Sequence, residues 1–417
     1  MKEKLFNRNF TLLILGQVSS LIGNYTLRFA LSMYVLEQTG SASVFAGLLS
    51  LALLPTILLS PFGGVLADRV NRRNIMAILD ALSGTAVLLA GFAMTFGRDI
   101  FVIGVLLVIL SVLGAFESPT VQACVPQMLS DGNIVKGNAV VSQTVSAASL
   151  ITPFTGSLFY TAFGLRAVFG GAVICFFVTA FLECFIQVDH KKAGSGMSLK
   201  RMLREDFSAG FYFIRRERPE ILKLLLLAAL VSLFVAGTAV VGFPYLVRSV
   251  LGLSARYYGA AESVMGIGAI LGSLCAAAWA GKFPACRLYG VFILFGICLL
   301  PCGIVFLIPS GTVACYLVLL AMFCVCQMGC SFFSTYAVTI IQRRTPRELM
   351  GKVMSYVFTL SMCAQPVGQI FFGALFDRFS DKAYWVLLPS GFIVCGIGIL
   401  SSGFFRKLES REAAFEK

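Results

Sequence analysis

The chain has 417 residues, of which 58% are apolar and only 13% are charged. A soluble domain is nearer one half apolar and one quarter charged, so the composition excludes an ordinary water-soluble enzyme and a disordered chain. A membrane helix uses roughly 20 residues, so the apolar content is enough for about twelve membrane spans. The net charge is +13, and the basic residues lie in loops between apolar runs. This arrangement favours contact with anionic lipid headgroups and makes nucleic acid an improbable partner.

Apolar runs of spanning length predict an all-α membrane protein with twelve transmembrane helices. The first six are expected at 10–36, 43–66, 75–96, 101–124, 134–160 and 166–187. The second six are expected at 219–247, 255–280, 287–308, 312–340, 350–376 and 384–405. The first run is long, carries polar residues and lacks a small-residue cleavage site, so it is predicted to be a span and not a signal peptide.

The spacing of these runs predicts two six-helix bundles, 1–187 and 219–417, joined by a linker at 188–218. Lys and Arg are concentrated in alternate loops, so the positive-inside rule places both termini in the cytoplasm. Apolar residues recur at helical spacing in the linker, at Leu199, Met202, Leu203, Phe207, Phe211 and Ile214. They predict a basic amphipathic helix on the inner membrane surface. A tether between the bundles and a simple solvated linker are equally compatible with this pattern.

The sequence offers few groups for cofactor chemistry. The 13 cysteines are scattered through apolar segments, and the only histidine is His190. We expect the thiols to be small buried hydrophobes, without a disulfide framework or a metal site. The chain has no Gly-rich phosphate loop ending in Gly-Lys-Ser/Thr, so ATP is not expected to drive it and no cofactor is implied.

The two halves repeat weakly. The fifth run carries Pro153-Phe154-Thr155-Gly156, and the eleventh carries Pro366-Val367-Gly368. Two six-span halves in the same orientation are the parallel-repeat plan of a secondary transporter, which binds its substrate between the halves near the middle of the membrane.

The loop between the second and third runs carries the most specific motif, Gly63-Gly64-Val65-Leu66-Ala67-Asp68-Arg69-Val70-Asn71-Arg72-Arg73. It resembles the loop signature of the major facilitator superfamily, Gly-x-Leu-Ala-Asp-Arg-x-Gly-Arg-Arg. Asn71 stands where that family usually has glycine, and asparagine tolerates positive φ, so we expect the turn to survive. The corresponding loop of the second half, from Gly272 to Lys282, has lost the aspartate.

The motif also predicts a gate. Its glycines would let the second helix pack closely on a neighbour, and Asp68 would pair with Arg72 and face the N-terminus of another helix. The gating residues are therefore expected to be Gly64, Asp68, Arg69, Arg72 and Arg73. Asp80 and Glu348 are further acids near the inner face and are expected to join this charge network.

Short motifs along the chain are similar to the drug-exporter branch of the superfamily, which includes macrolide efflux proteins and the enterobactin exporter. They are Gly16-Gln17-Val18-Ser19-Ser20-Leu21-Ile22-Gly23, Tyr34-Val35-Leu36, Thr39-Gly40-Ser41, Glu117 with Pro119, Asn138-Ala139 and Phe207-Ser208-Ala209-Gly210-Phe211. This resemblance implies the major facilitator fold and transport of small molecules, without enzymatic activity.

Three charged residues lie inside the predicted spans, where a charge is costly and usually functional. At 1.5 Å per residue, Arg28 and Glu262 lie roughly 8 Å outward of the membrane centre and Glu117 roughly 7 Å inward. Arg28 and Glu262 share a depth on different halves, so they are predicted either to pair across a central cavity or to be satisfied within their own halves. Glu117 is predicted to carry the coupling proton, with a structural hydrogen bond near Pro119 as the alternative.

Neutral polar side chains in the spans are candidates for the lining of the substrate cavity. They are Gln17, Asn24, Tyr25, Gln143, Gln327, Tyr336, Tyr356 and Gln365. With 38 Phe and 13 Met in the chain, such a cavity would suit bulky amphipathic ligands.

The function predicted from the sequence is export of amphipathic, drug-like or macrolide-like molecules across the plasma membrane by alternating access, in exchange for protons. The expected partners are the substrate, protons and membrane lipid, and the expected state is a monomer. A lysophospholipid or small-nutrient transporter of the same fold is the alternative, and an intramembrane enzyme a remote one. A channel is disfavoured because no re-entrant filter or ring of like charges is visible.

Overall fold

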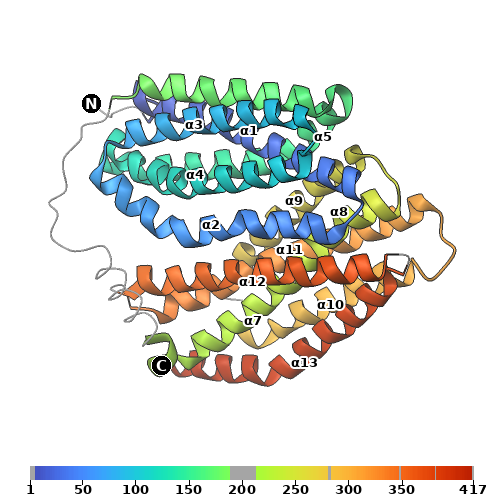
Figure 1. Ribbon diagram of the computed structural model, residues 1–417. Helices are drawn as coiled ribbons and strands as arrows, with labels where there is room; N and C mark the ends of the chain where they lie inside the picture. Colours follow the sequence, from blue (N-terminus) through green and yellow to red (C-terminus); the bar gives the residue numbers. More distant parts are fainter. Residues whose placement is uncertain (1–4, 188–212, 280–282, 347–348, 381, 416–417) are drawn as a thin grey trace. The chain divides into compact units, whose positions relative to one another are not determined.

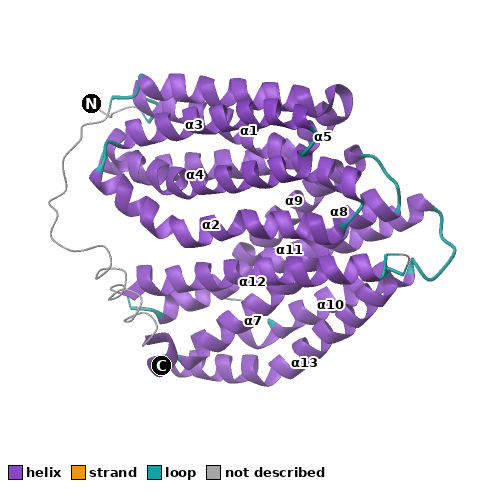
Figure 2. Cartoon of the chain, in the orientation of Figure 1, coloured by secondary structure: helices purple, strands orange, loops and turns teal. Residues whose placement is uncertain are grey.

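The structure is a computed structural model. It describes residues 5–187, 213–279, 283–346, 349–380 and 382–415. Every regular element in this part of the chain is helical (Figure 2). The predicted amphipathic linker helix lies outside the described residues, apart from a short π-helical turn, η2, at Phe213–Glu217.

The helices of the first half follow the predicted runs closely. They are α1 (Arg8–Thr39), α2 (Ala42–Arg69), α3 (Arg72–Ala93), α4 (Asp99–Met128) and α5 (Asp131–Cys184). The last of these contains Gly164 at φ +74°, a conformation that favours glycine. The chain therefore turns inside α5, which holds the two predicted runs 134–160 and 166–187.

The helices of the second half also match. They are α7 (Pro219–Val235), η3 (Ala236–Gly242), α8 (Phe243–Tyr245), η4 (Leu246–Val250), α9 (Ala255–Ala278), α10 (Tyr289–Ile304), α11 (Thr312–Arg344), α12 (Met350–Arg378) and α13 (Tyr384–Phe415). The first four form one apolar segment, Pro219–Val250, with π-helical turns.

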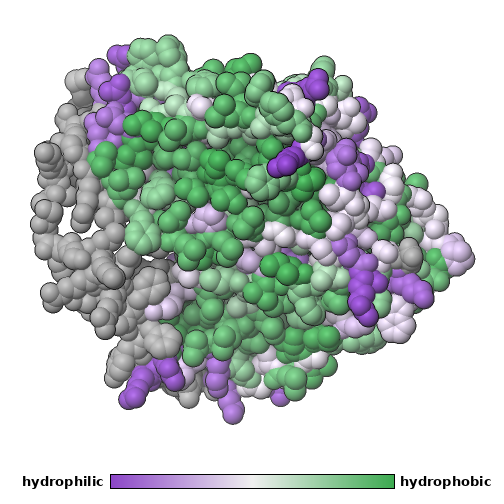
Figure 3. Space-filling view, in the orientation of Figure 1, coloured by the Kyte–Doolittle hydropathy of each residue, from purple (hydrophilic) through white to green (hydrophobic). Residues whose placement is uncertain are grey.

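By length and composition, eleven described helices are suited to cross a membrane. Because the segment Lys136–Cys184 holds two spans joined at Gly164, this agrees with the twelve predicted crossings. Many large apolar side chains are exposed, Leu400 by 85% and Phe101 by 71%. Apolar residues cover the visible sides of the helices, and hydrophilic residues gather toward helix ends (Figure 3). Such surfaces are suited to contact with lipid.

The chain divides into two compact units. Unit 1 comprises 1–39, 48–199 and 254–260, and unit 2 comprises 40–47, 200–253 and 261–417. In unit 1, α5 packs on α1 and α3, and α3 also packs on α4 (Figure 1). In unit 2, α10 packs on α13 and α11, and α12 packs on α7 and η3.

Glycines at helix contacts repeat between the two units. A Cβ on Gly63 of α2 would lie 2.5 Å from the Ala115 carbonyl oxygen of α4, which confirms the predicted close packing of the second helix. In unit 2, a Cβ on Gly272 of α9 would meet the Met328 carbonyl oxygen of α11 more closely still. The second helix of each half thus packs on the fourth through a glycine.

Candidate functional site

Carboxyl groups from two helices of unit 1 lie around one serine of α1, and a third carboxyl group is their electrostatic neighbour. The Ser20 hydroxyl donates to Asp80 Oδ1 of α3 at 2.9 Å and lies 3.5 Å from Glu117 Oε1 of α4. Glu183, near the end of α5, is an electrostatic neighbour of Asp80 and Glu117. We call Ser20, Asp80, Glu117 and Glu183 the carboxylate cluster.

Burial differs across the carboxylate cluster. Asp80 is 0% exposed, Glu183 2% and Ser20 3%, whereas Glu117 is only partly buried. Asp80 Oδ2 and Glu183 Oε2 are buried without a hydrogen-bond donor. From the sequence, Asp80 is expected in the gating network of the loop, but the structure buries it beside Ser20 of α1. Glu348 lies outside the described residues.

Glu183 and Ser20 were missed from the sequence. Glu183 stands near the end of an apolar run, where an acid is easily taken as a helix terminus, although an acid inside such a run was the criterion that identified Glu117. A serine in a span gives no comparable signal of function in the sequence. Only the packing of α1 against α3 and α4 brings Ser20 close to two carboxyl groups.

Arg28 is held within unit 1 by neutral groups. Its Nε donates to Asn24 Oδ1 at 2.7 Å, and its NH2 donates to Ser111 Oγ at 3.2 Å. Glu117 and Tyr25 are its electrostatic neighbours. The pairing of Arg28 with Glu262 stays a prediction, because the two residues belong to different units.

The loop between α2 and α3 fixes the ends of several helices. The Arg72 guanidinium donates to the carbonyl oxygens of Ala67 (2.8 Å) and Ala123 (2.6 Å), and Arg73 donates to that of Cys184. These bonds tie the start of α3 to the ends of α2, α4 and α5. Gly64, Asp68 and Arg69 lie outside the residues whose surroundings the structure describes, so the Asp68–Arg72 pair stays a prediction.

The expectation that Asn71 supports a turn of positive φ is wrong. Asn71 has φ −61° and ψ 115°, and its side chain accepts a hydrogen bond from the Arg73 amide. It is therefore the N-cap of α3, a position where asparagine is among the preferred residues.

Unit 2 contains a cavity of about 450 Å³ between α7, η3, α9, α11 and α12. Gln327 and Gln365, two of the predicted cavity residues, lie in its wall with Ser232, Ser331, Ser334 and Ser361. The rest of the wall is apolar and includes Phe333 and Phe358. None of the described lining residues carries a charge, so this is a neutral cavity with a mixed polar and apolar wall.

The other predicted cavity residues are placed as follows. Gln17 is buried on α1, Tyr25 is half-buried beside Arg28, Asn24 accepts from Arg28, and Gln143 is exposed on α5. In unit 2, Tyr336 donates to the Trp279 carbonyl oxygen at 2.7 Å, and Tyr356 packs against the apolar core. Of the eight, the structure brings only Gln327 and Gln365 to the cavity of unit 2.

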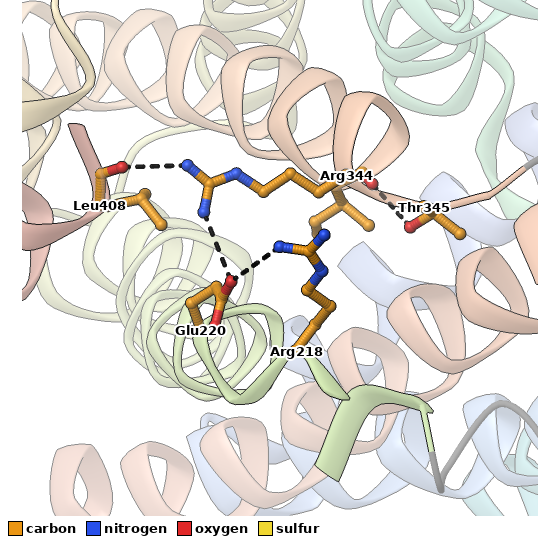
Figure 4. Close-up of polar contacts among 6 residues, drawn as sticks. Arg218, Glu220, Arg344, Thr345 and Leu408 are labelled. Carbon is orange, nitrogen blue, oxygen red and sulfur yellow. Dashed lines mark hydrogen bonds and ion pairs between the residues drawn. The ribbon is translucent and has the colours of Figure 1, made fainter. Parts of the chain in front are cut away.

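An ionic cluster lies at one end of unit 2. It was not predicted from the sequence. Glu220, in the first turn of α7, lies 3.6 Å from Arg218 and 3.8 Å from Arg344 of α11 (Figure 4). Arg344 also donates to the Leu408 carbonyl oxygen of α13 at 3.0 Å. The three helices are thereby joined at this end. Each of these residues stands at the edge of an apolar run, where a charge is expected in any loop.

The model of the Major Facilitator Superfamily matches residues 13–368. Macrolide efflux protein A of Streptococcus pyogenes is 25% identical over 386 residues, which cover 91% of this chain and 92% of that protein. Multidrug resistance protein MdtG of Escherichia coli O6:K15:H31 (strain 536 / UPEC) is 31% identical over 162 residues, 36% of this chain and 38% of that protein.

Solved structures agree on the fold. The structure of a bacterial homologue of the human lysosomal transporter Spinster superposes with a TM-score of 0.71 at 18% identity, covering 97% of each chain. The family matched over most of the sequence consists of transporters, not enzymes. The all-helical fold, the apolar spans and the family match together show that this chain belongs to the major facilitator superfamily.

Proposed function

We propose that the protein exports amphipathic small molecules of the macrolide or drug type by alternating access, in exchange for protons. The observation that carries the proposal is the neutral cavity of unit 2, whose wall combines glutamine and serine side chains with phenylalanine. Pockets for drug-sized ligands are mostly apolar with a few polar groups that fix orientation. The resemblance to macrolide efflux protein A, which extends over 91% of the chain, supports the same class of substrate.

Binding in such a cavity would use two kinds of contact. Phe333 and Phe358 offer large apolar surfaces, and Gln327 and Gln365 offer both donors and acceptors. A neutral wall places no ionic demand on the ligand. The cavity therefore suits polyoxygenated or weakly basic amphipathic molecules better than small nutrients carrying several charges.

Glu117 is proposed as the proton-coupling residue. The residue as a whole is partly buried, its carboxyl group contacts Ser20, and Arg28 is an electrostatic neighbour. A carboxyl group in such surroundings can exist neutral or ionised, and the change of charge can bias two conformations of a transporter. Protonation of Glu117 from outside and its release inside would couple proton entry to substrate exit.

The remaining elements of the proposal come from the sequence. Both termini are placed in the cytoplasm by the distribution of Lys and Arg, and the plasma membrane is the expected location. Asp68 with Arg69, Arg72 and Arg73 is proposed to hold the cytoplasmic side shut. The protein is expected to act as a monomer in contact with lipid.

The test is transport in proteoliposomes with an imposed pH gradient, with radiolabelled erythromycin as the macrolide probe. Gradient-driven transport is expected for the wild type and should collapse in Glu117→Gln, while equilibrium binding of erythromycin survives. Glu37→Gln is the matched control. Glu37 is another acid of α1, its carboxylate accepts a hydrogen bond from Tyr160, and it lies at the opposite end of α1 from Arg8.

Two outcomes would contradict parts of the proposal. Undiminished gradient-driven transport by Glu117→Gln would remove the coupling role of this residue. Transport of a lysophospholipid or of a small nutrient, without transport of any macrolide or drug in a panel, would favour the alternative cargo of the same fold.

A further inference from the structure

An apolar groove between α3 and α4 of unit 1 is not used by the proposed function. Its volume is about 490 Å³. On α3 its wall runs from Leu82 to Ala93, and on α4 it runs from Phe101 to Leu113. Hydrophobic residues cover the visible face of unit 1 where these two helices run (Figures 1 and 3). The groove therefore lies in a part of the unit that is suited to contact with lipid.

The wall of the groove offers almost nothing to a polar ligand. Of the described residues that line it, only Thr85 has a polar side chain, and its hydroxyl already donates to the Ala81 carbonyl oxygen at 2.7 Å. Leu89 and Phe101 of the wall are exposed at the surface of the unit. A drug-sized ligand needs a few polar groups that fix its orientation. The groove thus suits a hydrocarbon chain better than the proposed substrate.

The length of the groove matches one leaflet of a membrane. Leu82 and Ala93 are separated along the axis of α3 by a rise of about 17 Å. The hydrocarbon core of a single leaflet is about 15 Å thick, which is half of the bilayer core. One acyl chain lying along the groove would therefore extend from the membrane surface to the middle of the bilayer.

An exposed positive charge stands at one end of the groove. Arg98 is the N-cap of α4, and its carbonyl oxygen accepts a hydrogen bond from the Val102 amide of the groove wall at 3.0 Å. Arg98 is therefore one helical turn beyond the wall, and it is exposed. The adjacent Asp99 accepts a hydrogen bond from Tyr34 of α1 and keeps its other carboxylate oxygen buried. The acid is thus directed into the unit, while the arginine remains at its surface.

We propose that the groove binds one anionic phospholipid of the outer leaflet, with an acyl chain between α3 and α4 and its phosphate group against Arg98. The positive-inside rule places the loop before α4 outside the cell, which assigns the lipid to the outer leaflet. Lipid tails are as apolar as the groove, so the chain alone gains little by entering it. The affinity should come from the pairing of the guanidinium with the phosphate group, which favours lipids of net negative charge.

The experiment is native mass spectrometry of the purified full-length protein in detergent, titrated with phosphatidylglycerol or with phosphatidylcholine of the same acyl chains. The wild type should bind one phosphatidylglycerol molecule tightly and phosphatidylcholine more weakly. Arg98→Ala should weaken the first phosphatidylglycerol about fivefold, the contribution of one basic side chain near an anionic headgroup. Arg166→Ala is the matched control and should change nothing, because Arg166 is an exposed arginine of unit 1 just after the turn at Gly164.

A second variant fills the groove. Ala86→Phe places a ring in the space that the acyl chain would occupy, so it should abolish the tight phosphatidylglycerol adduct. Ala162→Phe is the matched control, because Ala162 is an exposed alanine of α5 outside the groove wall. A ligand that binds the folded state raises the melting temperature, so phosphatidylglycerol should stabilise the wild type and Ala162→Phe but not Ala86→Phe. Melting without lipid identifies a variant that fails to fold.

Three outcomes would overturn the lipid site. They are equal affinity of the wild type for the two lipids, equal effects of Arg98→Ala and Arg166→Ala, and equal effects of the two phenylalanine variants. Loss of a dimer in Ala86→Phe with unchanged lipid adducts would assign the groove to a second copy of the chain. Displacement of the tight phosphatidylglycerol by erythromycin would assign it to the substrate.

The proposed function is tested separately, because lipid binding needs neither the substrate nor a pH gradient. A wild type that binds phosphatidylglycerol as expected but does not transport erythromycin would overturn the proposed function and leave the lipid site standing.

Discussion

Unit 1 buries a group of carboxyl side chains, whereas the cavity of unit 2 is lined by neutral polar groups. Asp80 and Glu117 meet at Ser20 in the first unit, and Glu183 is an electrostatic neighbour of both. Gln327, Gln365 and four serines line the cavity in the second. Yet both units pack their second helix on their fourth through a glycine. A repeated fold can thus keep its packing while its interior chemistry diverges. On the proposed function, the first half would serve proton coupling and the second would bind the organic ligand.

The largest expected effect is that substitutions separate substrate binding from proton coupling. Gln327→Leu and Gln365→Leu remove hydrogen-bonding groups from the cavity, and each lost bond of about 1.4 kcal/mol would weaken binding about tenfold. Proton movement driven by any substrate that still binds should continue. Glu117→Gln should do the reverse and abolish coupling while binding persists.

The measurements are equilibrium binding of erythromycin and proton flux into proteoliposomes, made on the same preparations. Two results would contradict the proposal that unit 2 binds the substrate and unit 1 couples protons. One is a change in the number of protons moved per substrate in Gln327→Leu, and the other is a change in which substrates bind in Glu117→Gln.

A second prediction tests the shared packing. Gly63→Ala would place a methyl group against the Ala115 carbonyl oxygen, and Gly272→Ala would place one against that of Met328. Overpacking at a helix contact costs about 1–3 kcal/mol, so both variants should melt at lower temperature in detergent. Gly114→Ala is the control, because nothing lies within 4 Å of its Cβ position. Destabilisation of only one unit's variant would show that the two contacts are not equivalent.

A third prediction concerns the ionic cluster of unit 2. Arg344→Ala removes a partner of Glu220 and the donor to the Leu408 carbonyl oxygen. Leaving a nearly buried carboxylate less well paired should cost about 1–3 kcal/mol of stability. The neighbouring Arg343 is exposed, so Arg343→Ala should be close to neutral in the same melting experiment. Equal melting temperatures for the two variants would contradict a structural role for the cluster.

The sequence was sufficient for the helices because a membrane span is a long apolar run that is recognised without knowledge of its neighbours. The runs 43–66 and 312–340 became Ala42–Arg69 and Thr312–Arg344. Gly164 was the exception, since a single residue of positive φ joins two spans into one continuous element.

Candidate site residues could be identified from the sequence only where a single residue was unusual in its apolar run. Glu117 was identified as an acid in an apolar run, and Gln327 and Gln365 as polar groups in such runs. Ser20 and Glu183 gain their meaning from packing of α1, α3, α4 and α5, which the pattern of a single helix does not contain. Asn71 was misjudged because the family's glycine suggested a turn, while the local chain uses asparagine as a helix cap.

The smallest expected effect lies at the start of α2, whose residues 42–47 belong to unit 2 while the rest of the helix belongs to unit 1. The carboxylate of Asp377 in α12 accepts hydrogen bonds from the Ser41 hydroxyl (2.6 Å) and from the amides of Ala42 (2.6 Å) and Ser43 (2.9 Å). A carboxylate at a helix N-terminus satisfies free amides and opposes the positive end of the helix dipole, and its loss costs about 1 kcal/mol.

Asp377→Ala should therefore speed hydrogen exchange of the first amides of α2 and leave the later turns of the helix unchanged. Arg378→Ala, an exposed neighbour on α12, is the control and should leave exchange at both places as in the wild type. Faster exchange along the whole of α2 would show that the helix opens as one element and belongs to one unit. Faster exchange confined to the first turn would show that α12 holds this turn separately, so that the boundary between the two units runs through a single helix.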